Sequence, residues 1–310
     1  MDDYGLIIHW GLYSVPAFST TKKLKMQNGS EWYNARLTEK NTFRPVSGWK
    51  ETQAFHLQHY GESPYDNFLQ QFNIESAKWN PDNWMKLCKD IGASYIILTA
   101  KHHDGFCLWK TDTTDKQCDR NIISDFVHSA KKHGIRYGIY YSWWEFNTSI
   151  TIKFVNEIVI PQINELKQYT PDIWWFDGHW NIKTLYAKNT IDKIVSELLT
   201  TPHIWINDRI PLPQRATCRT FEDRYIPKTL PELESGQRWE HINTIGLSWG
   251  RNKQQTVKDY KTTEQLCDLY KHVSEMNGRF TLNLGPNPDG SFDQEEVKRL
   301  YELKEHMDNI

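Results

Sequence analysis

The sequence lacks the features that would direct a protein to a membrane or to nucleic acid. Its 310 residues contain no apolar run that approaches the ~18 residues needed for a membrane-spanning helix. Neither sign of charge is in large excess, because 37 Lys+Arg stand against 39 Asp+Glu and no run of like charges occurs. A nucleic-acid-binding surface needs a basic bias that is missing here. We therefore expect neither a membrane nor a nucleic acid as partner.

Cysteine is scarce and shows no paired spacing. The five cysteines are Cys88, Cys107, Cys118, Cys218 and Cys267. Because their number is odd and no CxxC pair occurs, we expect buried free thiols rather than a zinc site or a disulfide framework. No secretory leader precedes the first apolar segment, so the chain as written is predicted to be soluble and cytoplasmic. Sequons at Asn28-Gly29-Ser30 and Asn147-Thr148-Ser149 leave open a secreted or lysosomal-like protein whose leader has been removed.

A glycine-rich phosphate loop is also missing, since neither GxGxxG nor GxxxxGK[ST] occurs, and nucleotide binding is therefore not expected. Aromatic residues are abundant by contrast: 14 Trp, 15 Tyr and 13 Phe make up 14% of the chain. Many of these rings must lie beside polar groups. Such surroundings suit sugars, whose C–H faces stack on rings while their hydroxyls need fixed hydrogen-bond partners. A Trp-rich core is the alternative explanation.

The hydrophobic pattern repeats a unit of helix, glycine and strand. Asp82 is placed to cap an amphipathic helix that Gly92 ends, and an apolar strand follows over 95–100. In the next unit Ser124 is placed to cap a helix that Gly134 ends, followed by a strand over 137–141. This alternation predicts parallel strands joined by helices.

The same alternation of helix and strand continues along the chain. Helices around 161–169 and 191–199 precede strands over 173–176 and 204–206, while residues 6–8 and 280–282 supply an opening and a closing strand. Six strands are thus visible, and two more are expected between 215 and 250. The sequence predicts an α/β fold, a (β/α)8 TIM-like barrel formed as a single domain by residues 1–310.

Polar and aromatic groups stand directly after five successive strands. They are His9-Trp10-Gly11, Lys101-His102-His103-Asp104, Ser142-Trp143-Trp144-Glu145, Asp177-Gly178-His179-Trp180 and Asn207-Asp208-Arg209. In a barrel of this kind the carboxyl ends of the strands meet at one mouth, where reacting groups lie. Any one of these residues alone is more often a structural cap than a catalyst, but five in register indicate a site.

Two chemistries fit such a mouth. Three or four histidines with an aspartate could ligate a metal for hydrolysis, although the adjacent pair His102-His103 leaves a strand in opposite directions. Alternatively, two carboxylates could cleave a glycoside while the other side chains hold the sugar. Aromatic neighbours on both sides of Asp177, namely Trp175, Phe176 and Trp180, favour the sugar.

Several ordered motifs resemble the α-L-fucosidases of glycoside hydrolase family 29. They are Ile8-His9-Trp10-Gly11-Leu12-Tyr13-Ser14-Val15-Pro16, Glu31-Trp32-Tyr33, Leu98-Thr99-Ala100-Lys101-His102-His103-Asp104-Gly105-Phe106, Trp175-Phe176-Asp177-Gly178, Asn207-Asp208-Arg209, Ser248-Trp249-Gly250 and Leu282-Asn283-Leu284-Gly285-Pro286. The resemblance extends from about Tyr4 to about Gly290. It implies a retaining exo-α-L-fucosidase without a cofactor or a metal, acting on a fucosylated glycan or glycoconjugate.

The resemblance also implies roles for individual residues. Asp177 matches the nucleophile that forms a covalent fucosyl-enzyme. The expected fucose contacts are His9, Glu31, Trp32, His102, His103, Tyr141, Trp175, Arg209 and Trp249. The acid/base position varies within the family, and three candidates stay open, namely Glu222, Asp223 and Glu240. Asp223 beside Arg224 could instead be a surface ion pair, and Glu240 could be structural.

The chain also departs from the family pattern. Relatives commonly continue into a C-terminal β-sandwich, which is absent from the sequence as given: it ends at Ile310 after a helix that carries Leu300 and Leu303. The segment 18–71, which holds Glu31 and Trp32, is expected to be a long loop excursion that shapes the mouth. A lectin-like relative that binds fucose without cleaving it is the alternative function.

Overall fold

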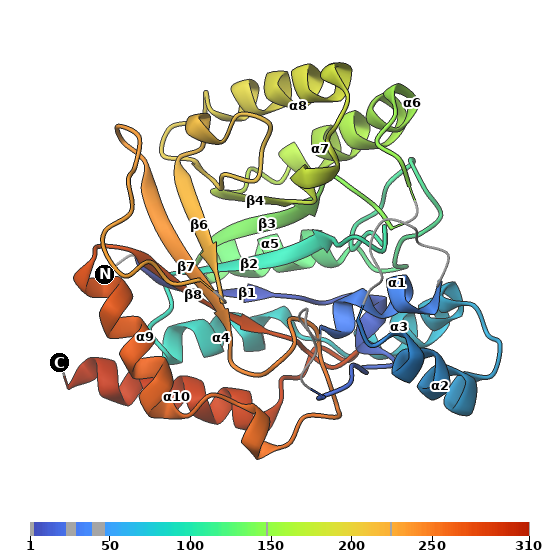
Figure 1. The fold of residues 1–310 in the computed structure, drawn as a ribbon, viewed down its shortest axis with the longest axis horizontal. Coiled ribbons are helices and arrows are strands. Elements are labelled where there is room, and N and C mark those ends of the chain that lie inside the picture. Colours follow the sequence, from blue (N-terminus) through green and yellow to red (C-terminus); the bar gives the residue numbers. More distant parts are fainter. Residues whose placement is uncertain (1–2, 23–28, 39–46, 147, 224, 310) are drawn as a thin grey trace.

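The computed structural model of the protein describes residues 3–22, 29–38, 47–146, 148–223 and 225–309 (Figure 1). Asn28 and Asn147 of the two sequons lie outside the described residues, as does Arg224. All five cysteines are buried and free, as expected from their spacing. Among the described residues, no helix is both long enough and apolar enough to cross a membrane.

Eight parallel strands form one sheet in the order β5-β4-β3-β2-β1-β8-β7-β6. The strands are Tyr4–Ile8 (β1), Tyr95–Lys101 (β2), Arg136–Ser142 (β3), Ile173–Asp177 (β4), Trp205–Ile206 (β5), Cys218–Glu222 (β6), Arg238–Thr244 (β7) and Arg279–Leu284 (β8). A bridge between Asn207 and Cys218 joins the two edges, so the sheet closes into a barrel. The predicted barrel is therefore confirmed, and β6 and β7 are the two strands expected between 215 and 250.

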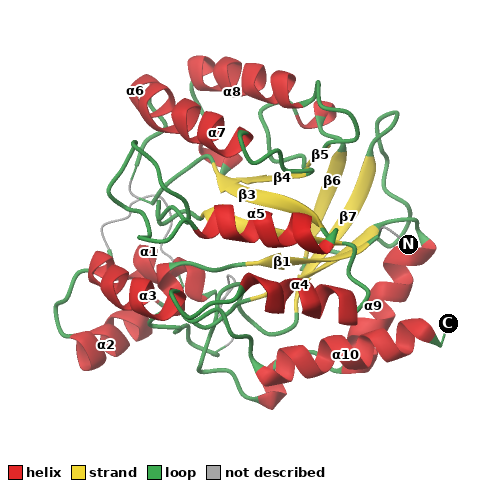
Figure 2. Cartoon of the chain, turned by 180° about the vertical axis from the view of Figure 1, so that it is seen from behind, coloured by secondary structure: helices red, strands yellow, loops and turns green. Residues whose placement is uncertain are grey.

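Helices cover the outside of this barrel. Five precede a strand, namely Pro81–Asp90 (α4), Ile122–His133 (α5), Ile160–Lys167 (α7), Leu185–Leu198 (α8) and Thr263–Glu275 (α9), while Ile152–Phe154 (α6) is a short turn and Gln294–Asp308 (α10) follows β8. Figure 2 shows α4 and α5 lying across the outer side of the strands. No α-helix lies between β5 and β7 in the described part of the chain, so the outer ring is incomplete there.

The helix caps lie two and three residues earlier than the sequence suggested. Asn80 caps α4 by accepting a hydrogen bond from the backbone N–H of Asp82, and Asn121 caps α5 by accepting from that of Ser124. Asp82 and Ser124 are thus the residues whose amides are capped, not the caps. Gly134 ends α5 in the left-handed conformation, as predicted.

The segment 18–71 is not simply a loop. Its described part contains the helices Tyr33–Leu37 (α1) and Trp49–Tyr60 (α2) and the first residues of Phe68–Ser76 (α3). In Figure 1 these helices lie together beside the end of β1 where its arrow points. The prediction of a loop was wrong because α2 buries only Thr52 and His56 and so carries little helical periodicity.

The core has two parts that the strands separate. One fills the barrel and consists of Ile7, Tyr95, Ile97, Tyr140, Ile173, Trp175, Trp205, Cys218, Ile242 and Trp249. The larger part lies between the strands and the helices and includes Ile96, Ile139, Tyr141, Trp174 and Phe176. Neighbouring residues of one strand therefore face opposite sides. This alternation decides which residues at the strand ends reach the mouth.

Candidate active site

Asp177, the last residue of β4, lies at the centre of a buried cluster at the mouth. Its side chain accepts hydrogen bonds from the Tyr140 hydroxyl at 2.7 Å and from an Arg209 terminal nitrogen at 2.6 Å. The Nε2 atom of His103 lies 3.5 Å from the same carboxylate, and the Gly178 amide donates at 2.9 Å. Only 7% of Asp177 is exposed. These donors fix the orientation of a carboxylate that stays accessible from the mouth.

Tyr140 and its neighbour Tyr141 face opposite ways. Tyr140 pairs with Trp175 across β3 and β4, so both point into the barrel below Asp177. The Tyr141 hydroxyl instead donates to Gln162 at 2.8 Å and accepts from Lys101 at 3.2 Å on the helix side. The expectation that Tyr141 contacts the sugar is therefore corrected: Tyr140 is the tyrosine at the site, because the pleat turns the next side chain outward.

Arg209 connects two acidic residues. One terminal nitrogen bonds Asp177, and the other lies 2.5 Å from an Oε1 oxygen of Glu222, the last residue of β6. Its guanidinium also lies over the Trp175 ring, 4.8 Å from the centroid. A guanidinium presents its donors in a fixed fork, so this contact sets the distance and angle between the two carboxylates.

The two carboxylates differ in proton affinity. Burial would raise the pKa of Asp177, but the Arg209 charge and the hydrogen bonds from His103 and Tyr140 hold that pKa well below its usual range. Burial raises the pKa of Glu222, and the negative charges of Asp177 and Asp223 raise it further. The positive charge of Arg209 lowers this pKa, but the net shift is upward. Glu222 therefore holds a proton more tightly than Asp177 does.

His9 and His102 form one wall of the site. Their ring centroids lie 5.7 Å apart, and both rings contact Tyr140. The His9 Nδ1 atom lies 2.6 Å from the side-chain oxygen of Asn283 on β8. Burial lowers the pKa of His9 to about 4 and that of His102 well below its usual range. Both imidazoles are thus neutral near pH 7. A neutral imidazole offers one hydrogen-bond donor and one acceptor, which suit the hydroxyl groups of a sugar.

Residues from distant loops complete the wall. Glu31 is buried, accepts a hydrogen bond from the Gly250 amide at 3.0 Å, and has its pKa raised by that burial. Trp32 lies 5.5 Å from the His103 ring, and Trp249 lies 5.2 Å from the His9 ring. The helical segment after β1 and the loop after β7 therefore bring these three residues to the strand ends.

The three acid/base candidates occupy different positions. Glu222 contacts Arg209 at the mouth, whereas Asp223 follows in the turn and is partly exposed. Glu240 is fully buried inside the barrel, where its Oε1 oxygen accepts from Trp175 at 2.7 Å and from Thr220 at 2.5 Å. Burial raises the pKa of Glu240 to about 7. Its hydrogen bonds support the structural interpretation of Glu240.

Some residues of the cluster were not singled out from the sequence. Tyr140 was missed. In the register of β3 and β4, Tyr140 pairs with Trp175 and Ser142 pairs with Asp177, so all four side chains face inward. The hydroxyl oxygen of Ser142 lies 2.6 Å from the Nδ1 atom of His103. Counting alternate residues back from the observed end of β3, Ser142, gives Tyr140, whereas the end expected from the sequence, residue 141, gives Tyr141.

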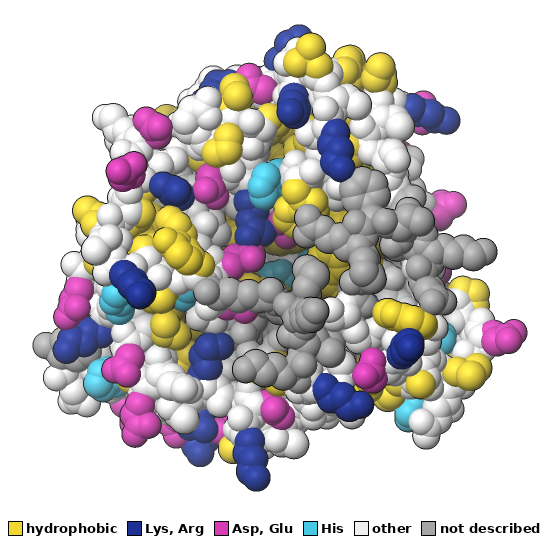
Figure 3. All heavy atoms as spheres, in the orientation of Figure 1, with side chains coloured by type: hydrophobic (Ala, Val, Ile, Leu, Met, Phe, Trp, Pro, Cys, Tyr) yellow, Lys and Arg dark blue, Asp and Glu magenta, His cyan; other side chains and the backbone are white. Residues whose placement is uncertain are grey.

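The arrangement of the site bears on the two chemistries left open by the sequence. No three His, Cys, Asp or Glu side chains within the described ranges converge as metal ligands. Instead, carboxylates, neutral imidazoles and rings surround the mouth. In Figure 3, acidic, basic and histidine side chains lie close together near the centre of the face drawn. This composition fits a sugar with hydroxyl groups better than a metal ion.

Comparison with known proteins agrees with this geometry. Residues 2–309 match the α-L-fucosidase family. The chain is 28% identical to tissue α-L-fucosidase of Rattus norvegicus, over 93% of this chain and 62% of the rat protein. It is 29% identical to α-L-fucosidase of Dictyostelium discoideum, over 97% of this chain and 67% of that protein. The chain therefore spans less than two thirds of the length of the rat relative.

Solved structures of a bacterial relative share the fold. Thermotoga maritima α-fucosidase in complex with a mechanism-based inhibitor superposes with a TM-score of 0.83 and 28% identity, covering 98% of this chain and 71% of that one. Its complex with fucose gives a TM-score of 0.80 at 28% identity, over 98% and 72% of the two chains. Because the family match takes in every strand and every residue of the mouth, the chain belongs to the α-L-fucosidase family.

Proposed function

We propose that the protein is a retaining exo-α-L-fucosidase that removes terminal α-L-fucose from glycans or glycoconjugates. The observation that carries this proposal is the bridge through Arg209, which joins an ionised Asp177 to a Glu222 of raised pKa. Retaining glycosidases need two carboxyl groups about 5–5.5 Å apart, one ionised and one protonated. Two carboxylates bound to the two ends of one guanidinium are compatible with that spacing.

The reaction would proceed in two displacements. An Asp177 oxygen attacks the anomeric carbon and forms a covalent fucosyl-enzyme, while Glu222 gives its proton to the departing glycosidic oxygen. Ionised Glu222 then takes a proton from water, and that water displaces Asp177 from the anomeric carbon. Arg209 and Tyr140, which hold Asp177, would keep it in position during both steps.

The remaining side chains would hold the sugar. His9, His102 and Glu31 offer polar atoms to the hydroxyls, while the rings of Trp32 and Trp249 suit the C–H face and the methyl group of fucose. The similar Thermotoga maritima α-fucosidase has been solved in complex with fucose, which supports this assignment. No cofactor is needed by this chemistry.

The first experiment measures nitrophenol release from 4-nitrophenyl α-L-fucoside by the wild type and by Asp177→Gly, each with and without azide. We expect the variant to lose at least about 10³-fold in kcat, and azide to restore turnover with β-fucosyl azide as the product. Inactive wild type that still binds L-fucose would instead support a lectin-like protein. A lack of azide rescue in a folded Asp177→Gly would remove Asp177 as nucleophile.

The same assay separates the acid/base candidates. With Glu222→Ala, we expect azide to attack the fucosyl-enzyme and give α-fucosyl azide, because the nucleophile is intact and only the proton donor is lost. Asp223→Ala is the matched control, being the adjacent carboxylate, and should retain activity without azide. If the two variants exchange these results, Asp223 is the acid/base.

A further inference from the structure

A second pocket lies at the opposite end of the barrel from the candidate active site. Its volume is about 700 Å³, and its walls come from the amino ends of β3, β4, β5, β7 and β8 and from the ends of α7 and α8. The active-site residues stand instead at the carboxyl ends of the strands. This amino-end pocket is therefore separate from the fucose site and has the size of small-molecule sites, which range over about 300–1,000 Å³.

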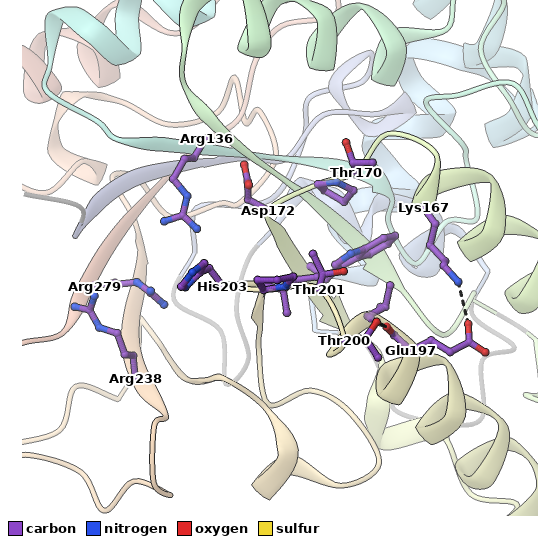
Figure 4. A pocket seen from close by; sticks show the side chains of 15 residues that line it. Arg136, Lys167, Thr170, Asp172, Glu197, Thr200, Thr201, His203, Arg238 and Arg279 are labelled. Atoms are coloured by element: carbon purple, nitrogen blue, oxygen red, sulfur yellow. Dashed lines mark hydrogen bonds and ion pairs between the residues drawn. The ribbon is translucent and has the colours of Figure 1, made fainter.

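The amino-end pocket has a positive lining. Four cationic groups, Arg136, Lys167, Arg238 and Arg279, stand against two carboxylates, Asp172 and Glu197. In Figure 4, Arg136, Arg238 and Arg279 gather with His203 on one side of the pocket, while Lys167 and Glu197 lie on the other.

Ion pairs use only part of this charge. Lys167 pairs with Glu197 at 2.9 Å, and Arg238 pairs with Asp3 at 2.6 Å. Within the described ranges, neither Arg136 nor Arg279 has a carboxylate at ion-pair distance. Arg136 and Arg279 thus bring two guanidinium groups without an ion pair to one side of the pocket, although the charge of Arg279 also acts on Glu240 inside the barrel.

Arg279 is held in place without being fully satisfied. Its guanidinium carbon lies 4.0 Å from the centroid of the Trp205 ring, which fixes the side chain against the barrel interior. Its Nε atom is buried and finds no hydrogen-bond partner among the described residues. Because this Nε atom is itself closed to solvent, an anion in the pocket would have to be bound by the terminal nitrogens of Arg279, whose position the Trp205 ring fixes.

We propose that the amino-end pocket binds a phosphomonoester of a small organic molecule. A phosphate monoester carries about −1.5 to −2 charges and several acceptor oxygens, which match the two available guanidinium groups and His203. A phosphate group alone is too small for about 700 Å³. The organic part would lie over the hydroxyls and the proline that line the other half, Thr170, Thr200, Thr201 and Pro202.

Isothermal titration calorimetry with glucose 6-phosphate and with adenosine 5′-monophosphate tests this proposal, in the presence of saturating L-fucose to occupy the other mouth. We expect saturable 1:1 binding of at least one ester and none of glucose or adenosine. Sulfate and inorganic phosphate at matched ionic strength should bind at least 10-fold more weakly than that ester. Equal affinity for sulfate would overturn the assignment to a phosphomonoester, and no saturable binding of either ester would overturn the site.

Variants show whether the pocket is responsible. Arg136→Gln removes a charge at the amino end of β3 and should weaken binding of the ester at least 10-fold. Arg219 is an exposed arginine outside the pocket, so Arg219→Gln should leave the affinity for the ester unchanged. The Tm without ligand reports whether each variant folds. If Arg136→Gln does not fold, His203→Asn serves instead, because asparagine tolerates the left-handed backbone at that position. Unchanged affinity in a folded variant would contradict the proposal.

Discussion

The adjacent tyrosines of β3 show that the role of a side chain depends on the face of the strand. Replacing Tyr140 by phenylalanine removes one hydroxyl that donates to Asp177 at 2.7 Å and leaves the ring in place. A hydrogen bond to a charged group contributes about 1.5–3 kcal/mol. We therefore expect Tyr140→Phe to lower the free energy of unfolding by about 1.5–3 kcal/mol. We also expect kcat/KM for 4-nitrophenyl α-L-fucoside to fall about 10- to 100-fold, because the nucleophile loses a donor that positions it.

Tyr141→Phe is the matched control for this prediction. It removes the hydroxyl that contacts Gln162 and Lys101 on the helix side of the sheet. This change should lower the free energy of unfolding by about 1–3 kcal/mol, because a buried polar network loses a member, and should leave kcat/KM within about threefold. The opposite result, with activity lost only in Tyr141→Phe, would contradict the assignment of the inward face.

Position at a strand end was enough to predict part of the site. His9 follows β1 directly, Asp177 is the last residue of β4, and Arg209 lies three residues after β5. Parallel strands bring the residues at their carboxyl ends to one mouth. The orientation of Tyr140 and Tyr141 depends on register and could not be taken from a run of two identical residues. The proposed acid/base, Glu222, is the carboxylate that meets Arg209, a contact between the end of β6 and the segment after β5 that no local pattern in the sequence encodes.

The caps of the outer helices provide a test at the level of elements. The Asn121 side chain accepts a hydrogen bond from the Ser124 amide at 3.0 Å and so begins α5. We expect Asn121→Ala to lower the free energy of unfolding by about 0.5–2 kcal/mol, measured by urea denaturation. Ser124→Ala, by contrast, should change it by less than about 0.5 kcal/mol. A larger loss of unfolding free energy in Ser124→Ala than in Asn121→Ala would show that Ser124 is the cap, as the sequence suggested.

The success of sequence prediction differed between elements for a physical reason. Helices such as α4 and α5 bury one continuous face against the barrel, so their periodicity is strong and their strands follow at a fixed interval. Helices α1 and α2, in the excursion after β1, are held by isolated contacts, such as the hydrogen bond between Tyr33 and His56 at 2.9 Å. Contacts of this kind leave no regular pattern in the sequence.

The barrel as a whole contains buried acids whose ionisation opposes folding. Burial raises the pKa of Glu240 to about 7 inside the barrel and that of Glu296, in the first turn of α10, to about 8. A glutamate in the unfolded chain ionises near pH 4.3. Since the folded state holds the proton more tightly, the stability that these groups contribute is present in full below that pH. It is lost as the pH rises through the raised pKa.

Glu240→Gln tests this loss because an amide keeps the shape of the side chain and cannot ionise. The Trp175 and Thr220 donors can still bond its oxygen. We expect the variant to match the wild type at pH 4 and to exceed its free energy of unfolding by about 1–3 kcal/mol at pH 8, measured by urea denaturation. Histidines of lowered pKa, such as His9 and His241, act in the opposite direction between about pH 4 and 6.5. They contribute equally to both proteins, so the difference isolates Glu240, and a constant difference across this range would show that its ionisation does not oppose folding.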